Sequence, residues 1–249
     1  MKSLLKGIVV LATLALVGCA TSPARERVLV SGATGKTGRL VVTELLARGY
    51  PVRALARDAQ AARKVLPAEV EVVAGNLRDR ESLTLAMRGV RRVISAAGAG
   101  TLDENDPNGP RAVDFEGTRN LVEAARAERV AQFVLISSQN VTAPDRYGFV
   151  AMRPLLRWKF QGEQALRTSG LRYTIVRPGQ LLDGPGGEQL RFAQGDALKG
   201  PIDRADLARV CVAALGRDAA LERTFEIVSS KTPGENDWTA LFGALAADR

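Results

Sequence analysis

The sequence contains no histidine, and it has only two cysteines and few aromatic residues. The absence of histidine excludes Ser–His–Asp chemistry, histidine general bases and histidine-ligated metals. Cys19 and Cys211 are too few for a disulfide framework or a cysteine-rich zinc site. Cys211 lies in an apolar helical pattern, which indicates a small core residue. We therefore expect no bound metal.

A dense run of lysine and arginine is also missing, although the formal net charge is +8. Basic residues are not interleaved with aromatic ones, so we expect no nucleic-acid partner and interpret the charge as a solvated basic surface. Such a surface favours an anionic membrane or a phosphorylated ligand. The composition is otherwise that of a globular protein, and 249 residues suffice for one well-buried domain.

The first twenty residues have the pattern of a secretory signal. Two lysines precede a short apolar run, and the apolar stretch at residues 4–20 is shorter than the roughly 20 residues of a comfortable membrane span. Its end, LVGC at residues 16–19, resembles the lipobox of bacterial lipoproteins. That resemblance implies cleavage before Cys19 and lipid attachment to this cysteine.

We accordingly expect residues 1–18 to be a signal peptide and residues 19–26 a short lipid-tether linker. Residues 27–249 are expected to form a single domain, anchored to the membrane on the periplasmic side of a cell envelope. The alternative is an uncleaved anchor, which would keep the domain on the cytoplasmic face.

Strand and helix patterns alternate along the rest of the chain. Strands are predicted at residues 27–31, 51–56, 70–73, 91–95, 132–137, 172–177 and 224–228, and helices at residues 36–48, 59–66, 80–88, 111–126, 155–169, 204–215 and 238–247. The alternation predicts an α/β fold, a Rossmann-type doubly wound parallel sheet. It loosens into a Gly/Asp-rich segment at residues 178–201, from which we expect a small C-terminal extension on the substrate side.

A glycine-rich loop joins the first predicted strand to the first predicted helix. Gly32, Gly35 and Gly38 have the spacing of a dinucleotide-binding loop. One glycine permits the tight turn, one lets the backbone approach a pyrophosphate, and one allows the helix to pack closely on the strand. The free N–H groups of the helix N-terminus then face the phosphates.

This spacing resembles the short-chain dehydrogenase/reductase superfamily. Residues 27–230 are similar to its atypical, NAD(P)-binding branch, which includes NmrA-like regulators, biliverdin/flavin-reductase-like enzymes and Tic62-like proteins. The matching stretches are VSGATGKTG (30–38), RALARD (53–58), VDFEGTRNL (113–121), FVLISS (133–138) and TIVRPG (174–179). The resemblance implies an NAD(P) cofactor, with residues 76–77 beside the adenine and residues 96–98 beside the cofactor ribose.

The candidate cofactor-binding residues are Gly32, Thr34, Gly35, Lys36, Thr37, Gly38, Arg57, Asn76, Leu77, Ala97, Gly98 and Lys159. Arg57 occupies the end of the second predicted strand, where NAD-binding domains place an acid for the ribose 2′-hydroxyl. A guanidinium there suits a 2′-phosphate, with Lys36 and Arg53 as further basic residues, so we expect NADP rather than NAD. Asp58 is the alternative, because it could bind a ribose hydroxyl instead.

The catalytic tyrosine of the superfamily is missing. No tyrosine is followed four residues later by lysine; Lys159 matches the family's lysine by resemblance, but Leu155 stands where the tyrosine would be. Ser137 and Ser138 are therefore the candidates to hydrogen-bond a substrate carbonyl, with water as the proton donor. The alternative is that both serines cap the strand end and Lys159 only contacts ribose.

Two hypotheses follow. One is an NADP(H)-dependent reductase of a small carbonyl, quinone or flavin-like acceptor, and the other is a non-catalytic NADP(H)-binding redox sensor or membrane assembly module with a protein partner. Export would separate the domain from free NADP(H). Either the cofactor is acquired before export, or the domain stays cytoplasmic, or it binds another nucleotide-like ligand.

Overall fold

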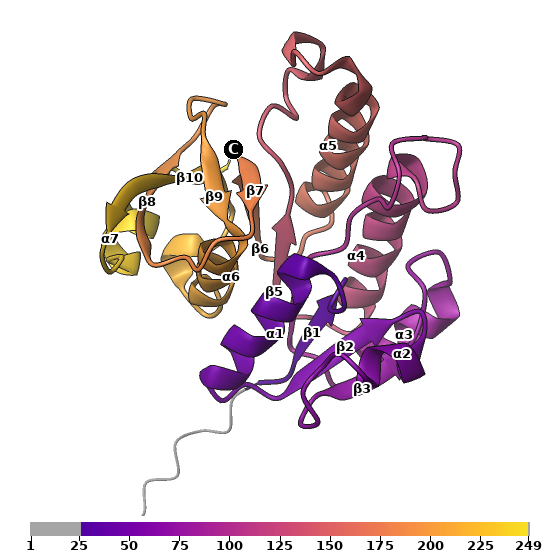
Figure 1. Cartoon of the computed structure of the whole chain (residues 1–249). Helices are drawn as coiled ribbons and strands as arrows, with labels where there is room; N and C mark the ends of the chain where they lie inside the picture. The colour runs from indigo at the N-terminus through magenta and orange to yellow at the C-terminus, as the bar shows by residue number, and fades with distance from the viewer. Residues whose placement is uncertain (1–25, 249) are drawn as a thin grey trace, which may run out of the picture.

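An eight-stranded sheet forms the centre of the protein, whose computed structural model describes residues 26–248 (Figure 1). The strands are β1 (Val28–Ser31), β2 (Val52–Ala56), β3 (Glu71–Ala74), β4 (Arg92–Ser95), β5 (Gln132–Ile136), β6 (Tyr173–Pro178), β8 (Glu188–Ala193) and β10 (Arg223–Pro233). Their order is β3-β2-β1-β4-β5-β6-β10-β8, and every neighbouring pair is parallel except β10 with β8. The predicted Rossmann-type doubly wound sheet is confirmed. Its strand order reverses between β1 and β4, where ligands bind in such folds.

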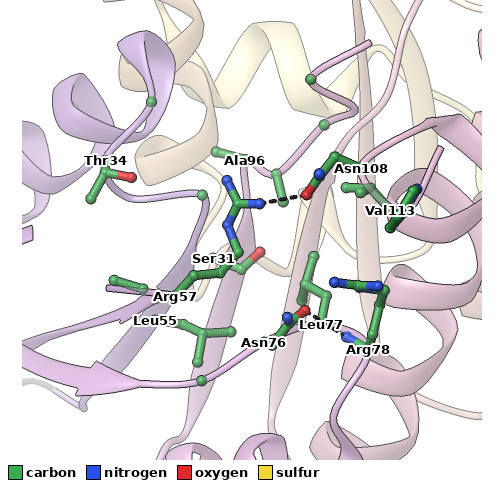
Figure 2. Close-up of a pocket in the computed structure, with 18 residues that line it drawn as sticks. Ser31, Thr34, Leu55, Arg57, Asn76, Leu77, Arg78, Ala96, Asn108 and Val113 are labelled. Atoms are coloured by element: carbon green, nitrogen blue, oxygen red, sulfur yellow. Dashed lines mark hydrogen bonds between the residues drawn. The ribbon is translucent and has the colours of Figure 1, made fainter. Parts of the chain in front are cut away.

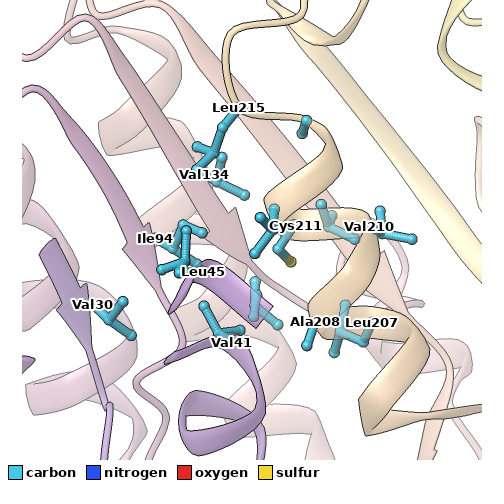
Figure 3. Packing of buried hydrophobic residues seen from close by; sticks show 14 of the residues in the cluster. Val30, Val41, Leu45, Ile94, Val134, Leu207, Ala208, Val210, Cys211 and Leu215 are labelled. Carbon is cyan, nitrogen blue, oxygen red and sulfur yellow. The ribbon is translucent and has the colours of Figure 1, made fainter. Parts of the chain in front are cut away.

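Helices cover both faces of the sheet (Figure 1). They are α1 (Lys36–Ala47), α2 (Ala59–Arg63), α3 (Arg80–Met87), α4 (Thr118–Ala127), α5 (Arg153–Arg167), α6 (Arg204–Ala213) and α7 (Trp238–Gly243). Apolar side chains of α1 and α6 pack together in one core cluster, and those of α3, α4 and α5 belong to a second. Figure 3 shows Val41 and Leu45 of α1 near Cys211 of α6 and the strand residues Ile94 and Val134.

Cys211 is fully buried in the first of these clusters, as its apolar sequence context predicts. Burial raises the pKa of its thiol well above the ordinary range, so the sulfur remains protonated and packs as a small apolar group.

The helix predicted at residues 111–126 begins differently. Its first part is a π-helical turn, η1 (Arg111–Gly117), which continues into α4. The backbone of Asp114 in this turn packs on Gly162 of α5 so closely that a Cβ at Gly162 would lie 2.3 Å from the Asp114 carbonyl oxygen. Wide turns of this kind often occur at functional sites, and here the turn carries Asp114 toward Lys159, as described below.

The C-terminal region is more regular than its sequence indicates. Residues 178–201 were expected to be a loosened segment, but they include β7 (Gln180–Leu182) and β8, and β7 pairs in parallel with β9 (Pro201–Asp203). β10 also extends to Pro233, because its second half pairs with β8 across a register shift. Strands of three residues among Gly and Asp carry too little alternation to be recognised. Short 3₁₀ turns η2 (Pro144–Arg146), η3 (Val150–Met152) and η4 (Asp218–Ala220) complete the described elements.

The predicted signal peptide, the lipidation residue Cys19 and the rest of the tether except Glu26 lie outside the described residues. Within residues 26–248, none of the helices has the length and apolar character needed to cross a membrane.

Candidate functional site

The glycine loop between β1 and α1 is shaped by two of its three glycines. Gly32 has a φ of +71°, and a Cβ there would lie 2.6 Å from the backbone nitrogen of Ala97 at the end of β4. A Cβ at Gly38 would lie 2.0 Å from the Gly32 carbonyl oxygen. A Cβ at Gly35, by contrast, would meet only that same oxygen, at 3.3 Å. The fold thus requires Gly32 and Gly38, whereas Gly35 leaves the loop open toward a ligand.

Helix α1 begins without a side chain that caps its N-terminus. Gly35 is its N-cap, no side chain accepts a hydrogen bond from its first N–H groups, and its first turn has no acidic residue. Asp58, Asp79 and Asp237 cap α2, α3 and α7 with their carboxylates. Uncapped N–H groups at the positive end of a helix dipole are a suitable partner for an anion. The residues present therefore fit a pyrophosphate.

A cavity of about 270 Å³ opens beside this loop at the carboxyl ends of the strands (Figure 2). It is lined by Ser31, Gly32, Thr34, Gly35, Leu55, Ala56, Arg57, Gly75, Asn76, Leu77, Arg78, Ala96, Ala97, Gly98, Gly100, Pro107, Asn108 and Val113. Eight of the twelve cofactor-binding candidates are in this lining. The other four, Lys36, Thr37, Gly38 and Lys159, are not. None of the lining residues, all of them in the described part of the chain, is acidic.

Arg57 extends into the cavity from the end of β2. Its Nη1 donates a hydrogen bond of 2.6 Å to Oδ1 of Asn108, which lies on the loop after β4 (Figure 2). Asp58, the alternative ribose contact, does not line the cavity, and its Oδ1 accepts the N–H groups of Gln60 and Ala61 at 2.9 Å as the cap of α2. The basic rather than the acidic residue of this pair thus lines the cavity.

The two other basic residues expected near a 2′-phosphate lie elsewhere. Lys36 forms an exposed ion pair of 2.6 Å with Asp183, just after β7. Arg53 is buried, donates to the carbonyl oxygens of Ala86 and Arg88, and pairs with Glu71 at 2.8 Å. Lys36 therefore connects the glycine loop to the C-terminal region, and Arg53 holds α3 against the sheet.

Arg78 also lines the cavity, although it was not among the residues predicted from the sequence. Its backbone N–H donates to Oδ1 of Asn76 at 3.1 Å, in a turn that leads from β3 into α3. The residue follows Asn76 and Leu77 directly, so its position next to two candidates was the available signal. Asn76 was expected beside the adenine, and in this structure its side chain also supports the turn.

Lys159 lies at the other end of the site, on α5. Its Nζ pairs with Oδ1 of Asp114 at 2.8 Å, and the Asp114 side chain is only 1% exposed. Oδ2 of Asp114 accepts the backbone N–H of Ala99, so one carboxylate joins α5 to the turn after β4. A Cβ at Gly98 would lie 3.8 Å from the Lys159 ammonium. Lys159 is thus held beside residues expected to contact the cofactor ribose, and Asp114 is a further residue that sequence reasoning missed.

The orientation of α5 is fixed by a second buried pair. Arg177 at the end of β6 donates to both carboxylate oxygens of Glu163, at 2.9 and 2.7 Å, and Glu163 is completely buried. Because Glu163 is one turn beyond Lys159, this bidentate pair sets the position of Lys159 relative to the sheet.

Ser137 and Lys159 line one small cavity of about 10 Å³, together with Ala97, Asp114, Thr118, Leu135 and Ile136. The Oγ of Ser137 is buried and has no hydrogen-bond partner among the described residues. Ser138 is half-buried and is not in this lining. The structure therefore brings one of the two candidate serines to Lys159.

None of the residues that line the two cavities, all of them in the described part of the chain, is a tyrosine. Leu155 is on α5, four residues before Lys159. Tyr173 donates its hydroxyl to Asp248 at 2.9 Å at the far end of β6, and burial, followed by this hydrogen bond, raises its pKa to about 12.

Comparison with known proteins identifies the family. Residues 32–218 match the model of the NAD(P)H-binding family, which is most of the chain. The chain belongs to this NAD(P)H-binding family. The match begins at the first glycine of the loop and ends beyond α6, so it includes every residue that lines the two cavities except Ser31. The resemblance to atypical short-chain dehydrogenases/reductases is thereby confirmed, whereas the match does not distinguish NADP from NAD.

Three proteins that are similar to this chain illustrate the range of its relatives. Sanguinarine reductase of Eschscholzia californica is 30% identical over 91% of this chain and 97% of its own length. Protein TIC 62 of Arabidopsis thaliana, a chloroplast protein, is 35% identical over 64% of this chain, which spans only 28% of that protein. The solved structure of the anaerobillin reductase ChuY from Escherichia coli O157:H7 has a TM-score of 0.72 and 26% identity, covering 84% of this chain and all of that one.

Proposed function

We propose that this NAD(P)H-binding protein is an NADP(H)-dependent reductase of a small carbonyl, quinone or flavin-like acceptor that works without the usual catalytic tyrosine. The choice of NADP(H) rests on the cavity beside the glycine loop, which contains Arg57 and no acidic residue. The assignment as a reductase is supported by two similar proteins, a sanguinarine reductase and an anaerobillin reductase.

In this proposal the glycine loop holds the pyrophosphate. Thr34 and Gly35 line the cavity, and the N–H groups of Lys36 and Thr37 belong to the uncapped first turn of α1. Gly38 contributes indirectly, because its lack of a side chain lets the helix approach the loop. The free energy of cofactor binding in the cavity beside the glycine loop would come from backbone dipoles and from the guanidinium of Arg57.

The adenosine end would be held by residues from three strand ends. Asn76 and Leu77 form the wall after β3, where the adenine would bind, and Arg57 after β2 would bind the ribose 2′-phosphate. Ala97 and Gly98 after β4 would contact the cofactor ribose. Ala97 also lines the smaller cavity, which contains Ser137 and Lys159.

The acceptor end has few groups for chemistry. The bound nicotinamide would supply the hydride. Lys159 would hold the nearby ribose through its ammonium, with Asp114 fixing the position of that ammonium. The Ser137 hydroxyl has no partner in the part of the chain that the structure describes, so it can donate a hydrogen bond to an acceptor oxygen. Ser138 carries a second, more exposed hydroxyl. Water would then provide the proton, since no side-chain acid replaces the tyrosine at position 155.

A non-catalytic NADP(H)-binding module is the second candidate. It is favoured by the small size of the cavity beside Ser137 and Lys159, about 10 Å³. The similarity to Protein TIC 62 also supports a role in a protein assembly, although this chain covers only part of that protein. A panel of quinones, flavins and small carbonyls, each with NADPH, separates the two candidates. Turnover of any acceptor supports the reductase, and tight NADPH binding without turnover supports the module.

Membrane attachment through Cys19 is also part of this proposal and rests on the lipobox-like ending of the predicted signal peptide. Replacing Cys19 by serine should release the protein from the membrane fraction or leave an uncleaved precursor. Mature protein of unchanged mobility in the same membrane fraction would exclude lipidation.

A further inference from the structure

Arg78 lines the same cavity as Arg57, and the cofactor-binding roles proposed above do not include it. Figure 2 shows the two arginines entering this space from different strand ends, Arg57 after β2 and Arg78 after β3. The two strands are parallel neighbours whose final residues, Ala56 and Ala74, are paired. The sheet register therefore brings both arginines to one edge of one cavity.

The turn that carries Arg78 is well fixed. Oδ1 of Asn76 accepts the Arg78 N–H, and the Asn76 carbonyl oxygen accepts the N–H of Asp79 at 2.8 Å. Asp79 in turn caps α3 through the N–H groups of Glu81 and Ser82. The backbone of Arg78 is thus held between a strand end and a capped helix, which limits where its side chain can reach.

The charges in this cavity are unbalanced. Arg57 donates to the neutral amide oxygen of Asn108, and within residues 26–248 the Arg78 guanidinium has no hydrogen bond or ion pair. No carboxylate is present in the cavity lining. Two guanidinium groups in one acid-free cavity create a positive potential that favours an anion of more than one charge.

We propose that Arg78 is a second determinant of NADP(H) selectivity and that Arg57 and Arg78 hold the 2′-phosphate between them. This inference rests on the proposed NADP(H) specificity. A phosphate monoester carries about −1.5 to −2 charges and three acceptor oxygens, enough for two planar forks of N–H donors. The 2′-hydroxyl of NAD offers neither the charge nor the acceptors, so both arginines would act on the difference between the two cofactors.

Calorimetric titration of the full-length protein with NADPH, NADH, 2′,5′-ADP and 5′-AMP tests this directly, because the last two differ only in the 2′-phosphate. We expect Arg78→Ala to weaken NADPH and 2′,5′-ADP by about 10- to 100-fold, similar to Arg57→Ala, and to leave NADH and 5′-AMP within about twofold. Arg78→Lys, which keeps the charge and loses the fork, should recover part of the affinity. Arg63→Ala, an exposed arginine on α2 outside the cavity, is the matched control and should change nothing.

If Arg78→Ala weakened NADPH and NADH equally, and 2′,5′-ADP and 5′-AMP equally, Arg78 would contact the adenine and not the phosphate. If it weakened none of these ligands, Arg78 would take no part in binding. Either result overturns the proposal that the two arginines clamp the 2′-phosphate. Wild-type protein that binds NADPH and NADH equally would also overturn it while leaving the cofactor site intact. Wild-type protein that binds neither dinucleotide would instead refute the proposed function, and the clamp with it.

Discussion

The two ends of the site differ in how completely they are built. At the adenosine end, the structure has an open cavity of about 270 Å³ with a glycine loop, an uncapped helix and two arginines. At the acceptor end, the cavity is about 10 Å³, Asp114 and Lys159 are already paired, and the buried Ser137 hydroxyl has no partner within residues 26–248. Both ends lie at carboxyl ends of the same sheet, so the fold alone does not account for the difference.

This comparison teaches that cofactor binding and catalysis place different demands on the chain. A pyrophosphate is common to NAD and NADP, so backbone N–H groups in a loop at a fixed strand end suffice to bind it. Two similar proteins are reductases of different acceptors, sanguinarine and anaerobillin. The smaller cavity in this chain is lined by residues after β4, at the end of β5, and on the π-helical turn, α4 and α5.

The largest effect that would sharpen this contrast comes from the glycine loop. Gly35→Val should abolish nucleotide binding, a loss of at least about 100-fold, while costing no more than about 1 kcal/mol of unfolding free energy. The reason is that Gly35 lines the cavity, and a Cβ there would approach only the Gly32 carbonyl oxygen, at 3.3 Å. Calorimetric titration and thermal unfolding measure the two quantities.

Gly35→Ala and Gly38→Ala form the matched pair for this prediction, because each adds one methyl group. At Gly38 the new Cβ would lie 2.0 Å from a backbone oxygen, so we expect a loss of about 1–3 kcal/mol or more in stability. If Gly35→Ala and Gly38→Ala lowered stability equally, the separation of ligand space from packing space in this loop would be wrong.

The next effect concerns adjacent residues at the adenosine end. Arg57→Ala should cost about 1.5–3 kcal/mol against NADPH and leave NADH binding unchanged, because only the phosphate accepts a charge-assisted bidentate contact. Asp58→Ala should instead remove the cap of α2, lowering stability by about 0.5–2 kcal/mol without altering the NADPH to NADH ratio. A change in cofactor preference from Asp58→Ala would reverse the assignment of the two residues.

Much of the fold follows from sequence pattern, for physical reasons. Buried parallel strands such as Gln132–Ile136 are continuous apolar runs between amphipathic helices, and this pattern is confirmed. β7 and β9 went unrecognised because three residues cannot show a period, and their pairing depends on residues about twenty positions apart. The π-helical turn was missed because it packs closely on Gly162 of α5, and a single sequence does not show such tertiary contacts.

The site divides in the same way. Gly32, Gly35 and Arg57 were predicted because the loop and the strand end are local in sequence, and the structure places them in one cavity. Lys36 was predicted near Arg57 from proximity in sequence, yet its side chain reaches Asp183, 147 positions away. Asp114 was overlooked because its partner Lys159 is on another helix, and a single sequence does not reveal such pairs.

At the acceptor end we expect a smaller effect on NADPH affinity and a larger one on stability. Lys159→Ala should weaken NADPH binding only about 3- to 10-fold, and it should lower stability by about 2–3 kcal/mol because it leaves the buried Asp114 carboxylate without its cation. In the double variant Asp114→Ala/Lys159→Ala, the stability loss should be less than the sum of the single losses. Strictly additive losses in a double-mutant cycle would show that the 2.8 Å pair contributes no coupling.

The smallest expected effect is on the pH dependence of any NADPH oxidation. With a Tyr–Lys pair, the pH–rate profile would show the ionisation of the tyrosine, and removing the tyrosine would abolish that ionisation. In this chain, however, position 155 is leucine, and burial raises the pKa of Tyr173 to about 12. Phenylalanine at Tyr50, Tyr147 or Tyr173 should therefore leave the profile between pH 6 and 9 unchanged. Tyr173→Phe should act on stability instead. Because the pKa of Tyr173 is raised in the folded state, wild-type stability falls as pH rises from about 10 toward 12, and the variant should lack this fall. If any one of the three substitutions shifted the pH–rate profile of NADPH oxidation, that tyrosine would be the acid. The acceptor end would then contain a catalytic tyrosine, as is usual in the superfamily.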